Sequence, residues 1–281
     1  MNMESSNGYD GYSPPKEEKR HPLTRQDTAT LYQTACEYPD REVELAVRTP
    51  LDFGLRVGEL VHIRSHWIEK EYNRQIGGEL WRIRVPKVEY CWGGKGGSVG
   101  AGNPDGQNLH ETNSPCSNCV GRNWEGKIEP EQGDGWLTWD QAEEYDWAPK
   151  RPRSATKVWA FPQIPDVAET AEKLKTFLEG QNHEQWPHGQ NAVRNRLDKV
   201  VERADLDLPD RSQPKVVPHA LRHTYGCRLV EMGIGEGAAM KQMRHQNADV
   251  FRWYSDVRGT RVISALNDAV SKSDSLLHRD R

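Results

Sequence analysis

Apolar residues at helical spacing are the sequence feature that most restricts the fold of this chain. One such stripe has the spacing i, i+4, i+7 and i+8 and consists of Val193, Leu197, Val200 and Val201. Apolar residues with this period occupy one face of a helix and must be buried against another element. A second stripe predicts a helix over about 165–179. The chain is therefore expected to bury several amphipathic helices against one another.

Residues with capping preferences predict where further helices begin and end. Thr24 is suited to begin a helix, and Asp40 is suited to begin a second one that ends at Gly54. Four more helices are expected over about 57–63, 218–232, 235–244 and 259–271. Two alternating segments around Gly77 and Gly78 predict a hairpin, and residues 157–162 predict another strand. The expected class is α+β, mainly α-helical, with a small antiparallel β-sheet.

The 281 residues suffice for one large domain or two small ones. Residues 1–20 are polar and broken by Gly, Pro and Ser, which predicts a disordered N-terminal arm. Residues 21–271 are expected to form the folded domain, followed by a C-terminal tail at 272–281. Within that domain, residues 91–146 contain few apolar residues, and we interpret them as a long insertion.

Composition points to a polar protein without a membrane segment. Hydrophobic residues make up 35% of the chain, and no apolar run approaches the roughly 20 residues that span a bilayer. The amino terminus lacks the apolar core of a signal peptide. These features predict a cytoplasmic protein.

Charge is distributed unevenly along the chain, although the formal net charge is only −4. Residues 125–146 carry eight acidic side chains and one Lys, whereas residues 211–262 carry nine Lys or Arg and four acidic side chains. Residues 148–162 add four cations and no acid. Such concentrated basic surface is typical of contact with a phosphate backbone.

A set of five residues has the chemistry needed to act on a phosphodiester. His219 and Arg222 share a predicted helix, His245 follows 23 residues after Arg222, and Tyr254 follows nine residues later. Arg56 lies far upstream in the segment GLRVGEL. Guanidinium groups pair bidentately with phosphate oxygens, imidazoles transfer protons near neutral pH, and a phenol can attack phosphorus. Tyr145 and Tyr225 are poorer candidates for the nucleophile, because nothing around them repeats this pattern.

This set resembles the active site of tyrosine recombinases, the phage integrase family, over about residues 22–271. The resemblance implies a recombinase catalytic-domain fold in which Tyr254 is the nucleophile and Arg56 and Arg222 bind the phosphate. His219 would then take part in general-base catalysis and His245 in transition-state binding, and His223 would have a packing or supporting role. The family's general acid is a hairpin Lys, for which Lys150 fits best and Lys157 and Lys87 remain alternatives. The link formed by tyrosine conserves the bond energy, so no cofactor is expected for catalysis.

Three departures from the family pattern are visible. The usual Leu-Gly-His reads Met243-Arg244-His245, which places a bulky cation where the family has glycine. The family's helical DNA-clamping domain has no counterpart in the roughly twenty residues that precede the catalytic segment. The long insertion is unusual too, although it is similar to Cys-bearing insertions of archaeal members.

The five cysteines fall into two groups. Cys36 and Cys227 lie in helical patterns and are expected to be small core residues. The remaining cysteines lie in or beside the insertion, and together with one histidine they could form a tetrahedral structural zinc site; the candidate ligands are Cys91, His110, Cys116 and Cys119. A Gly-rich loop with incidental thiols is the alternative interpretation.

The function predicted from the sequence is a site-specific DNA recombinase that cleaves and rejoins duplex DNA through a 3′-phosphotyrosyl intermediate, for integration or excision of a phage or other mobile element. The resemblance implies a homo-tetramer assembled on double-stranded DNA, with an accessory DNA-binding protein as a further partner and no membrane. Two alternatives remain: a nicking or relaxing enzyme without synapsis, and a non-catalytic DNA-binding regulator.

Overall fold

The computed structural model describes residues 22–91, 119, 147–149, 156–160, 165–206, 216–245 and 254. These residues form seven α-helices, two short 3-10 helices and a three-stranded antiparallel sheet. The expected mainly helical α+β class is confirmed. The predicted N-terminal arm, the helix over 259–271, the tail and nearly all of the insertion lie outside the described residues.

Two capped helices begin the fold, as predicted. Helix α1 (Arg25–Cys36) is capped by Thr24, whose side chain accepts a hydrogen bond from the Asp27 amide at 3.1 Å. Helix α2 (Arg41–Phe53) is capped by Asp40 and ends at Gly54, which adopts the left-handed conformation with φ 58°. A Cβ at Gly54 would lie 2.3 Å from the Tyr225 ring, so only glycine fits this turn.

The prediction that Cys36 is a core residue was wrong. The buried residues of α1 are Asp27, Leu31 and Ala35, which recur every four residues on one face. Cys36 follows Ala35 by one position, so its side chain points about 100° away from that face, and it is exposed. Cys227 is fully buried, which confirms the other half of the prediction.

The helix expected over 57–63 is shorter than predicted. Helix α3 (Val57–Leu60) has only four residues, and the 3-10 helix η2 (Ser65–Trp67) follows it. The amides of His62 and Ile63 donate to carbonyls three residues back, at 3.2 Å, so the last turn tightens instead of continuing. His62 therefore lies between α3 and η2 and not within a helix.

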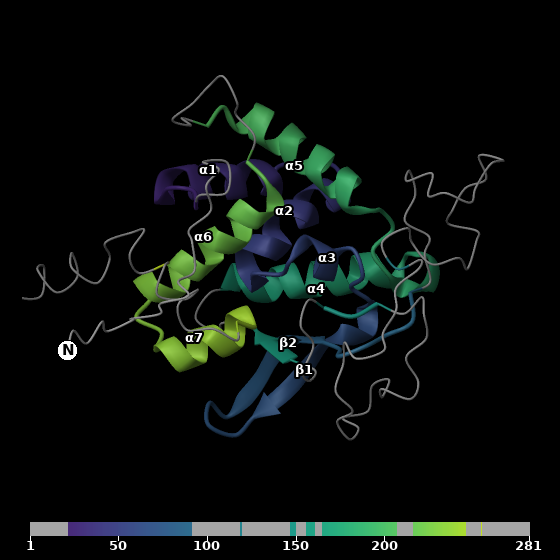
Figure 1. Ribbon diagram of the computed structural model, residues 1–281, viewed down its shortest axis with the longest axis vertical. Helices are drawn as coiled ribbons and strands as arrows, with labels where there is room; N and C mark the ends of the chain where they lie inside the picture. The colour runs from purple at the N-terminus through teal and green to yellow at the C-terminus, as the bar shows by residue number, and fades with distance from the viewer. Residues whose placement is uncertain are drawn as a thin grey trace, which may run out of the picture.

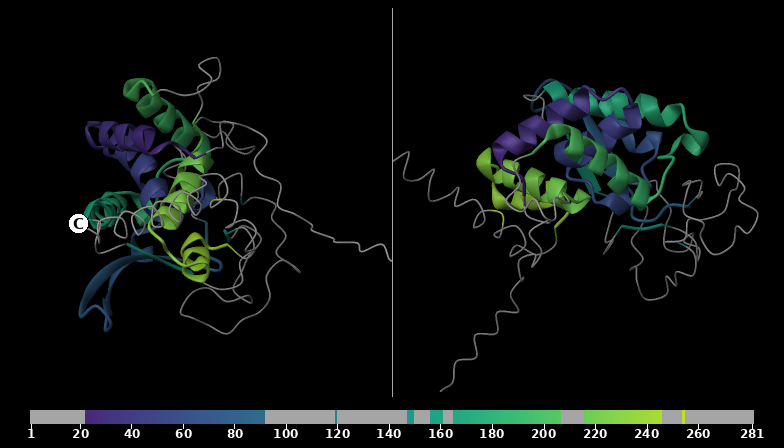
Figure 2. Two further views of the ribbon diagram at one scale, coloured as in Figure 1. Left: turned by 90° about the vertical axis from the view of Figure 1, so that its left-hand side faces the viewer. Right: turned by 90° about the horizontal axis from the view of Figure 1, so that it is seen from above.

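The small sheet has the strand order β1-β2-β3. Strands β1 (Ile68–Asn73) and β2 (Gly78–Val85) pair around the predicted turn, where Gly77 has φ 66°. Strand β3 (Thr156–Trp159) pairs with β2 on its other side. The hairpin of β1 and β2 extends away from the helices (Figure 2).

Helix α2 is the centre of the helical layer and packs against α1, α4 (Pro165–Glu179), α5 (Gln190–Ala204) and α6 (Pro218–Glu231) (Figure 1). The apolar stripe predicted on α5 is fully or almost fully buried, as expected. The short 3-10 helix η5 (Asn182–Glu184) connects α4 with the segment before α5. Helix α7 (Glu236–Met243) packs against both β3 and α6, and so joins the helical layer to the sheet.

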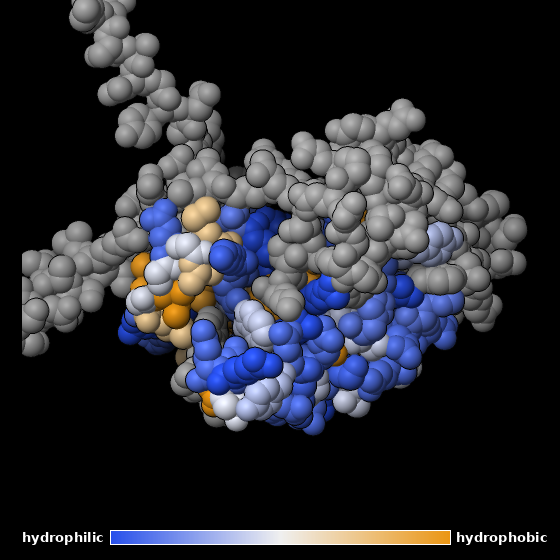
Figure 3. Space-filling model, turned by 90° about the horizontal axis from the view of Figure 1, so that it is seen from below, coloured by the Kyte–Doolittle hydropathy of each residue, from blue (hydrophilic) through white to orange (hydrophobic). Residues whose placement is uncertain are grey.

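The surface seen from below is mostly hydrophilic, with apolar atoms gathered at the left of the view (Figure 3). Figure 1 places α6 and α7 on that side, and Met232, in the turn between them, is 44% exposed. None of the helices in the described part of the chain combines the length and the apolar character needed to cross a bilayer.

Candidate active site

Arg56 is positioned by the start of α3. It is the N-cap residue, and its backbone amide and guanidinium donate to the two carboxylate oxygens of Glu59, at 2.7 and 2.8 Å. Gly54 turns the chain from α2 into α3 immediately before it. The Arg56 side chain is 25% exposed, so it can still reach a ligand. The local fold thus fixes one guanidinium at the edge of the site.

Glu59 forms the anionic centre of a cluster of three arginines. Its side chain is 1% exposed and lies 2.6 Å from Arg244, 2.8 Å from Arg56 and 4.0 Å from Arg222, measured between charged atoms. Burial alone would raise the pKa of this carboxyl, but Arg244, Arg56 and Arg222 hold it well below its usual range. Glu59 is therefore ionised at neutral pH. The sequence analysis did not assign it a role.

Arg222 connects three segments that are distant in the sequence. From α6, its guanidinium donates to the carbonyls of Gly54, at the end of α2, and Met243, at the end of α7. The side chain is 1% exposed. Burial, and then the charges of Arg56 and Arg244, lower its pKa below the ordinary value, although arginine keeps its proton in proteins. Arg222 is thus buried, cationic and held in one orientation.

Arg244 is a third guanidinium of the site and was not predicted from the sequence. It is the C-cap residue of α7 and adopts the left-handed conformation, with φ 54°. Its guanidinium donates to Glu59 and, at 2.9 Å, to the Gly54 carbonyl. These contacts hold the bulky cation at the end of α7 in place.

Replacing Arg244 by glycine is expected to destabilise the fold. Glycine would relieve about 1 kcal/mol of left-handed strain, but removing one partner of a buried ion pair costs roughly 3–5 kcal/mol. We expect the free energy of unfolding in urea to fall by about 2–4 kcal/mol, the difference between these terms. Asp205, with φ 45° at the end of α5, provides the control, because Asp205→Gly should be neutral or stabilising. If Arg244→Gly instead raised the free energy of unfolding, the ion pair of Arg244 with Glu59 would contribute no net stability.

Tyr254 lies between two histidines. Its hydroxyl is 3.1 Å from Nδ1 of His223, and its ring stacks on that of His245 with 5.8 Å between centroids and 13° between planes. The side chain is 1% exposed. Tyr254 also lies close to Arg222. A negative charge on the Tyr254 phenol would raise the pKa of the Arg222 guanidinium. The nucleophile predicted from the sequence is thus brought to both Arg222 and His245.

The two histidines of α6 differ from their predicted arrangement. His219 is exposed, and its ring lies edge-on to the His223 ring with 4.4 Å between centroids. His223, for which the sequence predicted a packing or supporting role, contacts the phenol directly. His219 and His223 are four positions apart and lie on the same face of α6, so the sequence does not reveal which of them contacts a residue far along the chain.

The remaining predicted residues have different outcomes. Lys150 lies outside the described residues, as does the side chain of Lys157, and Lys87 is buried. The assignment of the general acid therefore stays a prediction. Tyr225 is buried against Gly54, and its burial raises the pKa of its phenol. Tyr145 lies outside the described residues.

The sequence-predicted zinc ligands are only partly described. His110 and Cys116 lie outside the described residues, whereas Cys91 and Cys119 are both buried. His62, which the sequence analysis did not consider, lies with them: one ligand atom from each of the three residues falls within 4.8 Å of the others. These residues could hold a metal ion.

His245 is expected to make the fold sensitive to pH. Burial, and then the nearby Arg222 and Arg56, lower its pKa to about 2, so the imidazole is neutral in the folded protein at pH 7. An unfolded histidine takes up a proton below about pH 6.5. The stability due to the depressed pKa is therefore complete above pH 6.5 and is lost as pH falls from there toward 2, by at most about 1.4 kcal/mol per pH unit.

This effect can be isolated by comparing wild type with His245→Asn at pH 7.5 and pH 5. Unfolded carboxyl groups titrate mostly below this interval. The destabilisation on acidification should be larger in wild type than in the variant. Equal pH dependence of the two proteins would contradict a neutral His245.

A close contact with α6 fixes the position of Tyr254. A Cβ at Gly226 would lie 2.8 Å from Cε2 and Cζ of the Tyr254 ring. Gly226→Ala should therefore displace the phenol, and a misplacement of about 1 Å can reduce a reaction rate on the order of 10²-fold. Gly237→Ala on α7 is the control, since a Cβ there meets nothing within 4 Å. The rate of covalent attachment to DNA should fall in the first variant only, and equal rates would contradict the observed packing.

The assembled groups suit an anion that gains charge during a reaction. Three guanidiniums and one carboxylate leave a net charge of +2 around Tyr254 and His245. A phosphodiester attacked by a phenolate passes through a state with two negative charges. Preorganised donors of this kind stabilise developing charge where water is excluded.

Part of this chain is similar to a known protein family. The phage integrase family model matches residues 167–261, which include Arg222, His245 and Tyr254. Similar solved structures include the XerH site-specific recombinase bound to a palindromic difH substrate, with TM-score 0.49 and 11% identity over 88% of this chain and 52% of that one. The Tn1549 transposon integrase in complex with transposon right end DNA has TM-score 0.49 and 15% identity, over 90% of this chain and 65% of that one.

A lambda integrase dimer bound to a core site has TM-score 0.42 and 15% identity, over 88% of this chain and 62% of that one. The chain thus spans between about half and two thirds of the length of each of these proteins. No curated protein sequence matches it. Residues 167–261, about a third of the chain, are thus similar to the phage integrase family, the tyrosine recombinases.

Proposed function

We propose that this protein is a site-specific recombinase that cleaves and rejoins duplex DNA through a covalent bond to Tyr254. The single observation that carries the proposal is the convergence of Arg56, Arg222, His245 and Tyr254 around Glu59 and Arg244, from segments nearly 200 residues apart in the chain. Taken alone, each of these residues could be structural. Their common location in a buried site of net positive charge favours catalysis.

In the proposed reaction, the Tyr254 phenolate attacks the phosphorus and the 5′-oxygen leaves. The phenolic proton passes to His223, whose Nδ1 is 3.1 Å from the hydroxyl, and can continue toward His219 at the surface. Arg56 and Arg222 bind the non-bridging oxygens, and neutral His245 donates a hydrogen bond to one of them. A lysine protonates the 5′-oxygen, and Lys150 remains the preferred candidate for this role, with Lys157 and Lys87 as alternatives.

The charge of the site also supports a DNA substrate. Arg222 and Arg244 donate to backbone carbonyls, and both Arg56 and Arg244 bind Glu59. A phosphate would compete with these acceptors for the donors, and Arg56 is the most exposed of the three guanidiniums at 25%. We therefore propose that Arg56 makes first contact with the scissile phosphate.

Recombination joins two duplexes, which requires four active sites. We propose a homo-tetramer assembled on DNA, possessing the strand-exchange activity of a mobile-element integrase. An accessory DNA-binding protein would add DNA contacts to those made by the described domain.

The test is covalent capture on a library of randomised duplexes that carry a nick in the central region. The nick lets a short fragment diffuse away after cleavage and traps the protein on DNA. We expect a complex that resists denaturant and retains a 5′-label, since the protein is attached through a 3′-phosphate. Sequencing of the trapped duplexes should give inverted repeats. Tight binding with no covalent product would support a non-catalytic regulator, and trapping followed only by relaxation of supercoiled DNA would support a nicking enzyme.

A further inference from the structure

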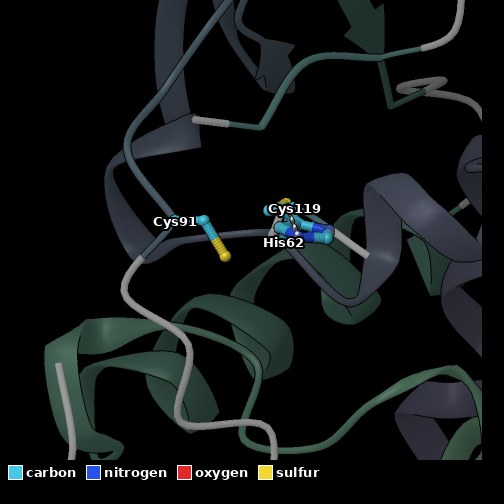
Figure 4. A group of neighbouring side chains, drawn as sticks. All are labelled: His62, Cys91 and Cys119. Atoms are coloured by element: carbon cyan, nitrogen blue, oxygen red, sulfur yellow. Dashed lines mark hydrogen bonds between the residues drawn. The ribbon is translucent and has the colours of Figure 1, made fainter. Parts of the chain in front are cut away.

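A second site lies away from the arginine cluster, where three separate segments meet. His62 follows α3, Cys91 follows the sheet segment that continues from β2, and Cys119 comes from within the long insertion. Their exposed fractions are 6%, 2% and 0%. The His62 ring and Cys119 lie against each other, and the Cys91 thiol lies beside them (Figure 4). We propose that His62, Cys91 and Cys119 form a structural zinc site, independent of the DNA chemistry.

The distances are close to those of a metal site. Nε2 of His62 lies 3.5 Å from Sγ of Cys119. In a tetrahedral zinc site, with bonds of about 2.0 Å to nitrogen and 2.3 Å to sulfur, the nitrogen–sulfur edge is about 3.5 Å. The ligand atoms of the three residues all lie within 4.8 Å of one another. A small movement of Cys91 would place three ligand atoms at the corners of a tetrahedron, and the fourth corner would take a ligand other than these three residues.

The His62 ring is oriented for metal binding. Its Nδ1 lies 2.7 Å from the Gly58 carbonyl, an acceptor that requires the proton on Nδ1. Nε2 then carries the lone pair, and this is the nitrogen that faces Cys119. A ligand histidine whose other nitrogen donates to a backbone carbonyl is the arrangement that fixes the tautomer in many metal sites.

The surroundings exclude water from the site. The Trp147 ring stacks on His62, with 4.9 Å between centroids and 15° between planes, and Trp67 stacks on Trp147. None of the described cysteines forms a disulfide. Two thiolates and an imidazole are soft or borderline ligands, which suit zinc better than magnesium or calcium. Binding would release the two thiol protons to solvent.

The site would hold the ends of the insertion together. The insertion begins at Cys91 and is followed by Trp147, whose backbone pairs with that of Glu89 through hydrogen bonds of 2.9 and 2.8 Å. His62 connects this junction to α3, the helix whose N-cap residue is Arg56. A metal ion would therefore stabilise both the insertion and the segment that carries the first catalytic arginine.

Metal analysis of the full-length protein, purified without chelators, tests the proposal. We expect about one zinc per chain by elemental mass spectrometry. Cys91→Ser and Cys119→Ser should lose most of it, whereas Cys36→Ser, at an exposed position on α1, should retain it. A wild-type protein with less than about a tenth of a zinc per chain, or unchanged zinc in both site variants, would overturn the proposal.

Cobalt(II) titration of the chelator-treated wild type gives a second readout that needs no variant to fold. Thiolate-to-cobalt charge-transfer absorption and the d–d bands of a tetrahedral ion are the expected results. Binding without charge-transfer absorption would exclude cysteine ligation. His62→Gln should bind cobalt more weakly than wild type, and unchanged affinity would remove His62 from the site. Neither result bears on the covalent capture of DNA, so the two proposals can fail separately.

Discussion

Tyr254→Phe is expected to abolish the covalent complex with DNA while leaving DNA binding intact. The variant lacks the oxygen that attacks phosphorus, and no other described tyrosine lies against both His223 and His245. Loss of the hydroxyl removes one contact to His223, which costs about 1 kcal/mol of stability. The fold should therefore persist. The measurement is the yield of denaturant-resistant complex on the captured duplexes.

Tyr225→Phe is the matched control for this experiment. Tyr225 is also a buried tyrosine, and it lies on α6 beside the site, packed against Gly54. Its phenol should contribute nothing to strand cleavage, so the variant should form the complex as wild type does. A covalent complex that survives in Tyr254→Phe, or is lost in Tyr225→Phe, would show that the nucleophile has been assigned wrongly.

Arg222→Lys is expected to reduce the rate of covalent attachment by about 10²–10³-fold, the usual loss for one preorganised donor in a site of this kind. Lysine keeps the charge but not the planar fork, so it cannot donate to Gly54, Met243 and a phosphate oxygen at once. Overall DNA affinity should change little, because one charge among many backbone contacts is preserved.

Arg228→Lys serves as the control for that variant. Arg228 lies on the same helix, and its guanidinium donates to the Leu51 carbonyl at 3.1 Å and lies 3.6 Å from Asp52, outside the cluster around Glu59. Its replacement should leave the rate within a few-fold of wild type. Equal effects of the two substitutions would mean that Arg222 acts through general charge or stability and not at the phosphate.

Local chemistry explains which parts of the structure were predictable. Helix ends are defined by hydrogen bonds within a few residues of Thr24, Asp40 and Gly54. The apolar stripe on α5 repeats with the helix period. Both features can therefore be recognised from neighbouring positions in the sequence. Arg56, Arg222, His245 and Tyr254 were identifiable because their sequence context resembles the active-site pattern of the tyrosine recombinases. The structure brings them together, although the roles assigned to them remain proposals.

The unpredicted features depend on contacts between distant segments. Arg244 binds Glu59 from 185 positions away, and no local pattern distinguishes such an arginine from a poor substitute for glycine. His62 reaches Cys119 across 57 positions, and it was overlooked because it lies in a segment expected to be a helix. Because α3 ends at Leu60, the His62 side chain lies beside Cys119 of the insertion.

Peptide mapping of the trapped complex tests the central claim most directly. After digestion of the protein and the DNA, mass spectrometry should locate the nucleotide remnant on the peptide that contains Tyr254, joined to the phenolic oxygen through a 3′-phosphate. A remnant on Tyr225, on another side chain, or on a 5′-phosphate would contradict the account.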